Sequence, residues 1–406
     1  MQVFKSIILL SKFSGLLIWC VLFLSACNND NNVTPTPEEG SFLVSSTQVG
    51  TISKETVIQT ASDTDVTLKI FAQSYVKNGV KTYRITYKTK NTDGAEITAS
   101  GALIVPVTNQ AASLISIQHG TISSDSEAPS NFGANSESAS LGTLFGALGY
   151  IVAYPDYIGY GASKDYPHPY EHRASLASAS LDMLRAVKEF LKNQNEIKWD
   201  EKLYIGGYSE GGYATMSLQK KIEEEASSEF NLRASSCGAG AYDKTAFMNE
   251  VVNNTTHGIS NYNRLYLWVM LTYDRIYKIG KPSTYYFKEP FATQIGTLGT
   301  GYSITQSFNT ILTDSFKKSL NDGTDKAFVD AVADNNVYNW KPKTPTRLYH
   351  GDKDPLVFYF NSVNAFNAMK KLGATNVELI PIPGGTHATS VTPFLLGTYT
   401  FFAGTK

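Results

Sequence analysis

The segment Leu203-Tyr204-Ile205-Gly206-Gly207-Tyr208-Ser209-Glu210-Gly211-Gly212 is the most informative part of this 406-residue chain. An apolar run suited to a buried strand leads into Gly-x-Ser-x-Gly, and a helical pattern follows. This order predicts a sharp strand-to-helix turn with the Ser209 hydroxyl exposed. Gly207 and Gly211 leave room there for neighbouring backbone, and the helix dipole favours negative charge beside the serine. We therefore expect Ser209 to be a nucleophile.

Short apolar runs alternate with helical patterns on both sides of this turn. A β-hairpin is predicted over residues 81–107, with Asn91-Thr92-Asp93-Gly94 at its turn. Apolar runs follow at 114–118, 150–154, 203–208, 234–241, 347–350 and 377–382, and helical patterns at 139–148, 172–191, 216–222, 362–371 and 393–402. Buried strands between helices predict an α/β fold with a mostly parallel sheet covered on both faces. Ligands bind at the carboxyl ends of such strands.

A histidine base is needed because a serine hydroxyl alone is a weak nucleophile. In proteins with this turn the acid and the histidine follow the serine in that order, which selects among the six histidines. His119, His168 and His172 precede Ser209. His257 falls too early to follow an acid at the end of a strand, and His350 ends the strand that precedes the candidate acids. His387 remains, on the loop after the run 377–382, and is the predicted base.

Two aspartates compete for the acid in Gly351-Asp352-Lys353-Asp354-Pro355-Leu356-Val357, which follows the run 347–350. Pro355 and the apolar pair after it should turn the chain back onto the sheet and leave Asp354 facing the histidine. Asp352 would then brace the loop. We therefore predict Asp354 as the acid.

An oxyanion hole requires two backbone N–H groups aimed at the developing negative charge. Glu210, directly after the nucleophile, should supply one. The loop His119-Gly120-Thr121, which follows the run 114–118, should supply the other. Gly120 permits close approach of the backbone, and the Thr121 N–H is the expected donor.

Several further motifs carry a resemblance to a known family. Pro155-Asp156-Tyr157-Ile158-Gly159-Tyr160-Gly161, His168-Pro169-Tyr170, Ser180-Leu181-Asp182-Met183-Leu184-Arg185-Ala186, the serine motif, and His350-Gly351 with Asp354 and Val357 look like the secreted lipase and esterase branch of the α/β-hydrolases. The resemblance covers roughly residues 100–400. It implies an α/β-hydrolase fold, cleavage of carboxylic esters through an acyl-enzyme on Ser209, and a site floor shaped by Asp156 and Tyr157. This chemistry requires no cofactor.

An inserted cap is expected at about residues 243–340, where the strand-helix alternation breaks and aromatic residues gather. Residues 42–406 then form one hydrolase domain that carries this insertion. Four tyrosines at helical spacing, Tyr262, Tyr266, Tyr273 and Tyr277, could form the core of the cap or a wall of the substrate pocket. In either case an apolar pocket is expected.

The N-terminal segment is interpreted as a targeting signal. Lys5 and Lys12 precede an apolar run over 15–26, which is shorter than a membrane-spanning helix. Leu24-Ser25-Ala26-Cys27 resembles the lipobox of bacterial lipoproteins. We expect a lipoprotein signal peptide over 1–26, lipidation of Cys27, a flexible tether over 27–41, and a place on a membrane of the bacterial cell envelope. An ordinary signal peptide is the alternative. Cys237 would remain the single free thiol, and its apolar surroundings predict burial.

Charge and histidine spacing argue against two other classes of protein. Lysine and arginine number 35 against 36 aspartates and glutamates, with no polybasic run, so nucleic acid is not an expected partner. His168-Pro169-Tyr170-Glu171-His172 fits a zinc-peptidase pattern. Ligation would require both histidines on one helical face, but Pro169 biases His168 away from helical geometry and suits a helix that begins just after it. We expect no metal site.

Three other functions remain open for the same residues. A serine peptidase would use the same triad, although the prolyl-oligopeptidase kind needs a propeller that the stretch before the first core strands is too short to supply. An acyltransferase would differ only in the acceptor. A non-catalytic binding lipoprotein should lack a triad or oxyanion element, whereas the chain offers a candidate for each.

Overall fold

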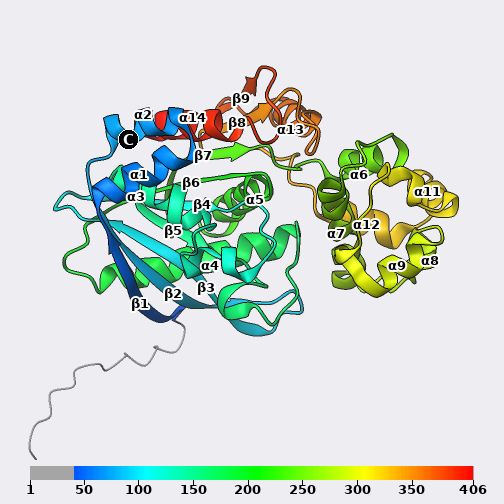
Figure 1. Ribbon diagram of the computed structural model, residues 1–406, viewed down its shortest axis with the longest axis horizontal. Coiled ribbons are helices and arrows are strands. Elements are labelled where there is room, and N and C mark those ends of the chain that lie inside the picture. Colours follow the sequence, from blue (N-terminus) through cyan, green and yellow to red (C-terminus); the bar gives the residue numbers. More distant parts are fainter. Residues whose placement is uncertain (1–40, 406) are drawn as a thin grey trace, which may run out of the picture. The chain divides into compact units, whose positions relative to one another are not determined.

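The computed structural model describes residues 41–405 (Figure 1). The predicted signal peptide, Cys27 and all of the tether but residue 41 lie outside this range. No helix within it has the length and apolar character of a membrane span.

A single sheet of nine strands organises the described residues, in the order β1-β2-β3-β5-β4-β6-β7-β8-β9. The strands are β1 Leu43–Ile52, β2 Val80–Lys90, β3 Glu96–Pro106, β4 Ala112–Gln118, β5 Ile151–Pro155, β6 Trp199–Tyr208, β7 Asn231–Gly238, β8 Thr346–Gly351 and β9 Val377–Ile382. The predicted hairpin is confirmed as β2 and β3, which pair antiparallel from Val80 opposite Pro106 to Lys90 opposite Glu96. From β5 to β9 in this order, each strand runs parallel to the next one. The predicted mostly parallel sheet is thereby confirmed.

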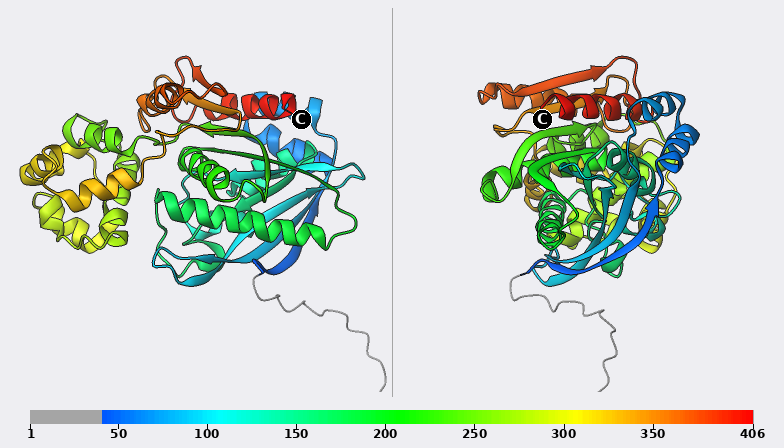
Figure 2. Two further views of the ribbon diagram at one scale, coloured as in Figure 1. Left: turned by 180° about the vertical axis from the view of Figure 1, so that it is seen from behind. Right: turned by 90° about the vertical axis from the view of Figure 1, so that its left-hand side faces the viewer.

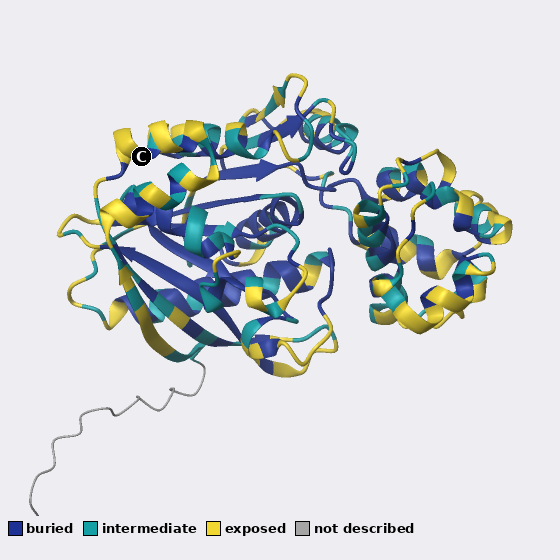
Figure 3. Ribbon diagram, in the orientation of Figure 1, coloured by how far each residue is buried: buried dark blue, intermediate teal, exposed yellow. Residues whose placement is uncertain are grey.

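Helices cover both faces of the sheet (Figures 1 and 2). One face packs against α1 Lys54–Thr64, α2 Val66–Tyr75, α3 Thr143–Ala147 and α14 Val391–Gly404. The other face packs against α4 Arg173–Lys192, α5 Glu210–Glu225 and α13 Phe360–Lys371. Figure 3 shows that the central strands are buried along most of their length, while the outer faces of the helices are exposed. Such double burial explains why these strands read as unbroken apolar runs in the sequence.

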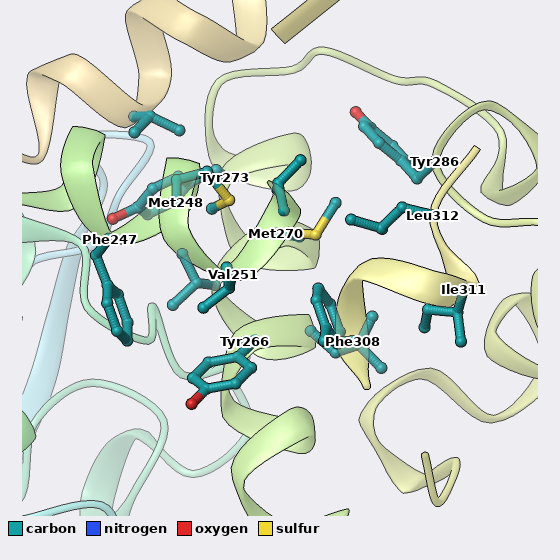
Figure 4. Close-up of a cluster of buried hydrophobic side chains, with 14 of the residues drawn as sticks. Phe247, Met248, Val251, Tyr266, Met270, Tyr273, Tyr286, Phe308, Ile311 and Leu312 are labelled. Atoms are coloured by element: carbon teal, nitrogen blue, oxygen red, sulfur yellow. The ribbon is translucent and has the colours of Figure 1, made fainter. Parts of the chain in front are cut away.

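Seven helices follow β7 and precede β8 in the described chain. They are α6 Lys244–Asn253, α7 Ser260–Ile276, α8 Ser283–Tyr286, α9 Phe291–Leu298, α10 Phe308–Ile311, α11 Asp314–Asn321 and α12 Lys326–Asp334. They occupy the place expected for the cap and gather at one end of the sheet (Figure 1). Their buried side chains form a separate hydrophobic core, part of which Figure 4 shows. Tyr266 and Tyr273 belong to this core, whereas Tyr262 is only partly buried and packs against it.

Two glycines let the turn after β6 pack against the end of β4. A Cβ on Gly207 would collide with the carbonyl oxygens of Gln118 and Gly211, and a Cβ on Gly211 would collide with that of Gln118. The contacts are with backbone, which cannot rotate out of the way. The sequence therefore needs glycine at both positions for packing.

Replacing Gly211 by alanine should lower the free energy of unfolding by roughly 1–3 kcal/mol, because the added methyl group overpacks a rigid backbone contact. Urea denaturation of the two proteins measures this difference. Gly404→Ala is the matched control, since no atom lies within 4 Å of a Cβ built there. Equal stability of Gly211→Ala and the parent would show that the turn does not need the close approach.

Candidate active site

Ser209 lies at the junction of β6 and α5 in a strained backbone conformation, with φ 60° and ψ −125°. Non-glycine residues rarely adopt positive φ, and such strain gathers at functional sites. The Ser209 N–H donates to the Gly238 carbonyl at 2.9 Å, which ties the turn to the end of β7. The strand-to-helix turn predicted from the glycine-serine motif is therefore present.

The structure brings the three predicted triad residues together. Nε2 of His387 lies 2.9 Å from Oγ of Ser209, and Nδ1 of His387 lies 2.6 Å from Oδ2 of Asp354. An ionised carboxylate only accepts hydrogen bonds, so Nδ1 carries the hydrogen and Nε2 presents a lone pair to the serine hydroxyl. The side chains come from the loops after β6, β8 and β9, which meet at one edge of the sheet.

The two carboxylate oxygens of Asp354 have different partners. Oδ1 accepts from the backbone N–H groups of Leu356 and Val357 at 2.9 and 3.0 Å, and Oδ2 faces His387. Burial would raise the pKa of Asp354, but hydrogen bonds from His350 and His387 outweigh it and hold the pKa at about 2. The carboxylate therefore stays ionised throughout the neutral range.

His350 supports this acid, a role that sequence order alone did not reveal. Its Nε2 lies 2.7 Å from the Val357 carbonyl and 3.4 Å from Oδ2 of Asp354, and its Nδ1 lies 2.7 Å from Oγ of Ser362. A carbonyl only accepts, so Nε2 carries a hydrogen that the nearby carboxylate also attracts. The one feature of the sequence that could have indicated this contact is the position of His350 at the end of the strand that precedes Asp354.

Asp352 contacts the loop that carries His387. Its Oδ1 accepts from the Gly384 N–H at 2.7 Å. Tyr208 also acts on this loop, because its hydroxyl donates to the His387 carbonyl at 2.8 Å. The two contacts fix the backbone on either side of the imidazole.

Two backbone N–H groups beside Ser209 are available to an oxyanion. Within residues 41–405, no group accepts a hydrogen bond from the N–H of Glu210 or of Thr121. Gly120 differs, because its N–H donates to Oε1 of Glu137 at 3.1 Å. The other Glu137 oxygen accepts from the Tyr154 hydroxyl at 2.5 Å. Glu137 thus holds the loop 119–121, which we call the oxyanion loop because of its predicted role. Nothing in the sequence around Glu137 indicated this contact.

Asp156 and Tyr157 lie behind the oxyanion loop. The Asp156 carbonyl faces Nε2 of His119 at 3.1 Å, and the Tyr157 hydroxyl donates to the His119 carbonyl at 3.1 Å. The Tyr157 and His119 rings also pack at 4.1 Å between centroids. Both residues therefore contact His119, but neither of them lines the cavity at Ser209.

The histidines of the zinc-like pattern have other partners. Nε2 of His168 lies 2.8 Å from the buried carboxylate of Glu210, and Nδ1 of His172 lies 2.9 Å from Oγ of Ser175. The helix expected just after His168 begins only at Arg173, because residues 170–171 form a turn. No cluster of three or more His, Cys, Asp or Glu side chains suited to a metal occurs in the described range.

A buried ion pair lies near the same turn. Lys244, at the start of α6, donates to Glu171, and its ammonium lies 4.2 Å from the centre of the Tyr213 ring. Burial raises the pKa of Glu171 and lowers that of Lys244, and their mutual attraction opposes both shifts. Cys237 is buried as predicted, and burial raises the pKa of its thiol to about 12, which leaves it unreactive at neutral pH.

A cavity of about 450 Å³ opens onto Ser209 and His387. Its outer wall includes Tyr262, Arg264 and Leu265 of α7, together with the oxyanion loop. One of the four cap tyrosines, Tyr262, therefore contributes to the wall, while Tyr266 and Tyr273 form core.

The nine-stranded sheet, the strand-to-helix turn at Ser209, and an aspartate and a histidine after later strands define the α/β-hydrolase fold class. The chain belongs to the secretory lipase family, whose model matches residues 135–392. It is accordingly a hydrolase that acts on esters. A comparison with curated protein sequences returns no match.

Solved structures of bacterial and fungal proteins share this fold. A suggested hydrolase of Legionella pneumophila is 25% identical, with a TM-score of 0.79, over 90% of this chain and 98% of that one. The rice cell wall degrading esterase LipA of Xanthomonas oryzae is 24% identical, with a TM-score of 0.70, over 89% and 96%. Candida antarctica lipase A in its closed state is 17% identical, with a TM-score of 0.64, over 91% and 84%.

Asp354→Asn should leave the fold intact and reduce kcat by ~10⁴-fold, as an equivalent change does in another triad. Since Oδ1 accepts two backbone N–H groups, the new amide oxygen should take that place and its NH₂ group should face His387. Nδ1 must then accept, so the ring hydrogen moves to Nε2 and the serine proton has no acceptor.

Asp352→Asn is the matched control for this change. Its amide oxygen can still accept from Gly384, so turnover should stay within a factor of about three, the loss of one weak hydrogen bond at most. Steady-state hydrolysis of p-nitrophenyl butyrate measures both variants. A large loss in Asp352→Asn with little change in Asp354→Asn would reverse the assignment of the acid.

Proposed function

We propose that this protein hydrolyses carboxylic esters through an acyl-enzyme on Ser209. The observation that carries the proposal is the continuous hydrogen-bonded series from Ser209 through His387 to Asp354, at 2.9 and 2.6 Å. The two N–H groups of Glu210 and Thr121, which have no acceptor within residues 41–405, and membership of a secretory lipase family support it further.

In acylation, Oγ of Ser209 attacks the ester carbonyl while Nε2 of His387 takes the hydroxyl proton. The negative charge moves to the carbonyl oxygen, where the N–H groups of Glu210 and Thr121 would each stabilise it by ~3 kcal/mol. Asp354 stabilises the imidazolium without taking its proton. The C–O bond to the alcohol then breaks, and the imidazolium returns its proton to the departing oxygen.

In deacylation, a water molecule takes the place of the alcohol. His387 removes a proton from the water as its oxygen attacks the acyl carbonyl, and the same two N–H groups receive the negative charge. When the bond to Oγ of Ser209 breaks, the imidazolium returns the proton to the serine. The carboxylic acid leaves and the enzyme regains its starting state.

We further propose that the protein is held on a membrane of the cell envelope by a lipid on Cys27. This residue lies outside the described range, so the support comes from the sequence Leu24-Ser25-Ala26-Cys27. Membership of a secretory family is consistent with a site outside the cytoplasm. The chain length between Cys27 and the first strand at Leu43 would allow the hydrolase domain to reach substrates near the membrane surface.

Ser209→Ala should abolish ester hydrolysis and leave the thermal unfolding midpoint nearly unchanged, because alanine removes only the hydroxyl group. The wild-type protein should also be labelled by a fluorophosphonate, which reacts with activated serines, and the variant should not. Hydrolysis of p-nitrophenyl butyrate and gel fluorescence provide the two measurements. Activity of the variant within tenfold of the parent, with contamination excluded, would refute the proposal.

Cys27→Ser should release or mislocalise the protein if this cysteine carries the lipid anchor. Membrane and soluble fractions of expressing cells, probed for the protein and for incorporated palmitate, measure the effect. Retained esterase activity in the released variant serves as the control for folding. Equal membrane association of variant and parent would contradict lipidation at this position.

A further inference from the structure

The cavity at Ser209 continues away from the cap into the hydrolase fold. Beyond the serine its wall is formed by β4 and β5 of the sheet and by the helical segments that cover this face. We call this part the deep branch; its members are Ile115, Ile117, Leu141, Phe145, Tyr154, Val391, Phe394, Leu395, Thr398 and Phe402. It lies between the sheet and α3 and α14, whereas the outer part of the cavity lies under α7.

The polar atoms along the deep branch already have protein partners. Both oxygens of Glu137 accept hydrogen bonds, from Gly120 and Tyr154. The Thr398 hydroxyl is paired with Ser236 at 2.6 Å. The side-chain amide of Gln118 donates to Ser116 and its oxygen accepts from Thr215. Each of these polar side chains therefore has a protein partner, and the remaining wall of the branch is aliphatic or aromatic.

The deep branch ends inside the protein. Ile117, Leu141 and Val391, near the serine, are only partly buried, while Phe145 and Leu395 are 4% and 9% exposed. Ile115 and Phe402, at 1% and 0%, close the far end. An α-helix rises about 1.5 Å a residue, so the wall from Val391 to Phe402 is roughly 16 Å long. A zigzag hydrocarbon with bonds of about 1.5 Å would fit roughly twelve carbons into that length.

A closed apolar branch suits the part of an ester that stays on the enzyme. The alcohol must leave before water can enter, and a closed branch offers it no way out. The acyl group remains bonded to Ser209 through both steps and returns past the serine only when the acid is free. Burial of each methylene of that group would also add hydrophobic stabilisation to the transition state.

We propose that the deep branch is the binding site for a straight acyl chain of about eight to twelve carbons. Ile115 and Phe402 limit the length of this chain, and Leu141, Phe145 and Leu395 set the width of the branch. This inference rests on the proposed esterase function. The substrates would be medium-chain fatty acyl esters, whose alcohol lies in the outer part of the cavity, beside Thr121, Asn261 and Arg264.

The first experiment measures kcat/KM of the full-length protein on p-nitrophenyl acetate, octanoate, dodecanoate and palmitate. Titration with diethyl p-nitrophenyl phosphate gives the concentration of active serine for each preparation. For the wild type, kcat/KM should rise by up to about threefold for each methylene buried and fall again at palmitate. A matching series of alkyl acetates, in which only the alcohol lengthens, should show a much flatter dependence.

Two variants alter the deep branch in opposite directions. Leu141→Phe should narrow it and lower kcat/KM on octanoate by about tenfold more than kcat/KM on acetate. Leu395→Ala should widen it, so that a longer chain can bend into the added space, and shift the optimum toward palmitate. Leu396→Ala, one residue along α14 and outside the cavity, is the matched control and should keep the wild-type optimum.

The outcomes separate this proposal from the proposed function. No labelling by the organophosphate and no acetate hydrolysis in the wild type would refute the esterase function itself. If the wild type is active, equal losses on all chain lengths in Leu141→Phe, an unchanged optimum in Leu395→Ala, or a chain-length dependence that follows the alcohol would each overturn the deep branch as the acyl site. Should Leu395→Ala fail to fold, the Leu141→Phe result still decides.

Discussion

The contact between the turn at Ser209 and the end of β4 is the constraint on which the rest of the site depends. Gly207 and Gly211 meet the Gln118 carbonyl so closely that neither tolerates a Cβ. The contact joins the turn that carries Ser209 and Glu210 to the loop that carries Thr121. The strained φ of Ser209 persists because β7 holds its N–H on the opposite side.

Buried or partly buried carboxylates surround this turn, and each has a partner that compensates its loss of hydration. Asp354 is held by backbone N–H groups and by two histidines, Glu210 by His168, Glu137 by Gly120 and Tyr154, and Glu171 by Lys244. An unpaired charge in such surroundings would cost several kcal/mol and would disturb the charge that develops at the proposed oxyanion site. These partners therefore explain how several carboxylates can lie close together around the turn.

The cap folds around its own core but is tied to the site by a few specific contacts. Tyr266 donates to the Leu356 carbonyl in the acid loop, Arg264 reaches Ser123 after the oxyanion loop, and Trp268 stacks on Tyr170 at 4.6 Å. Tyr170 in turn lies 3.2 Å from the Thr121 hydroxyl. These contacts link the position of α7 to the two loops that would bind and cleave the ester, so the cap shapes the outer cavity directly.

Local sequence determined the elements and the candidate triad of this protein. The apolar runs, the glycines around Ser209 and the order of serine, aspartate and histidine are properties of short segments, and each points to one local structure. Only the tertiary structure decided that Asp354 faces His387 while Asp352 holds Gly384, because the choice depends on which carboxylate reaches a loop about thirty residues later. The same holds for Glu137 and His350, and for the deep branch. The identity of a residue does not indicate which distant residue it will contact. A cavity, likewise, exists only where side chains from distant parts of the sequence leave space unfilled.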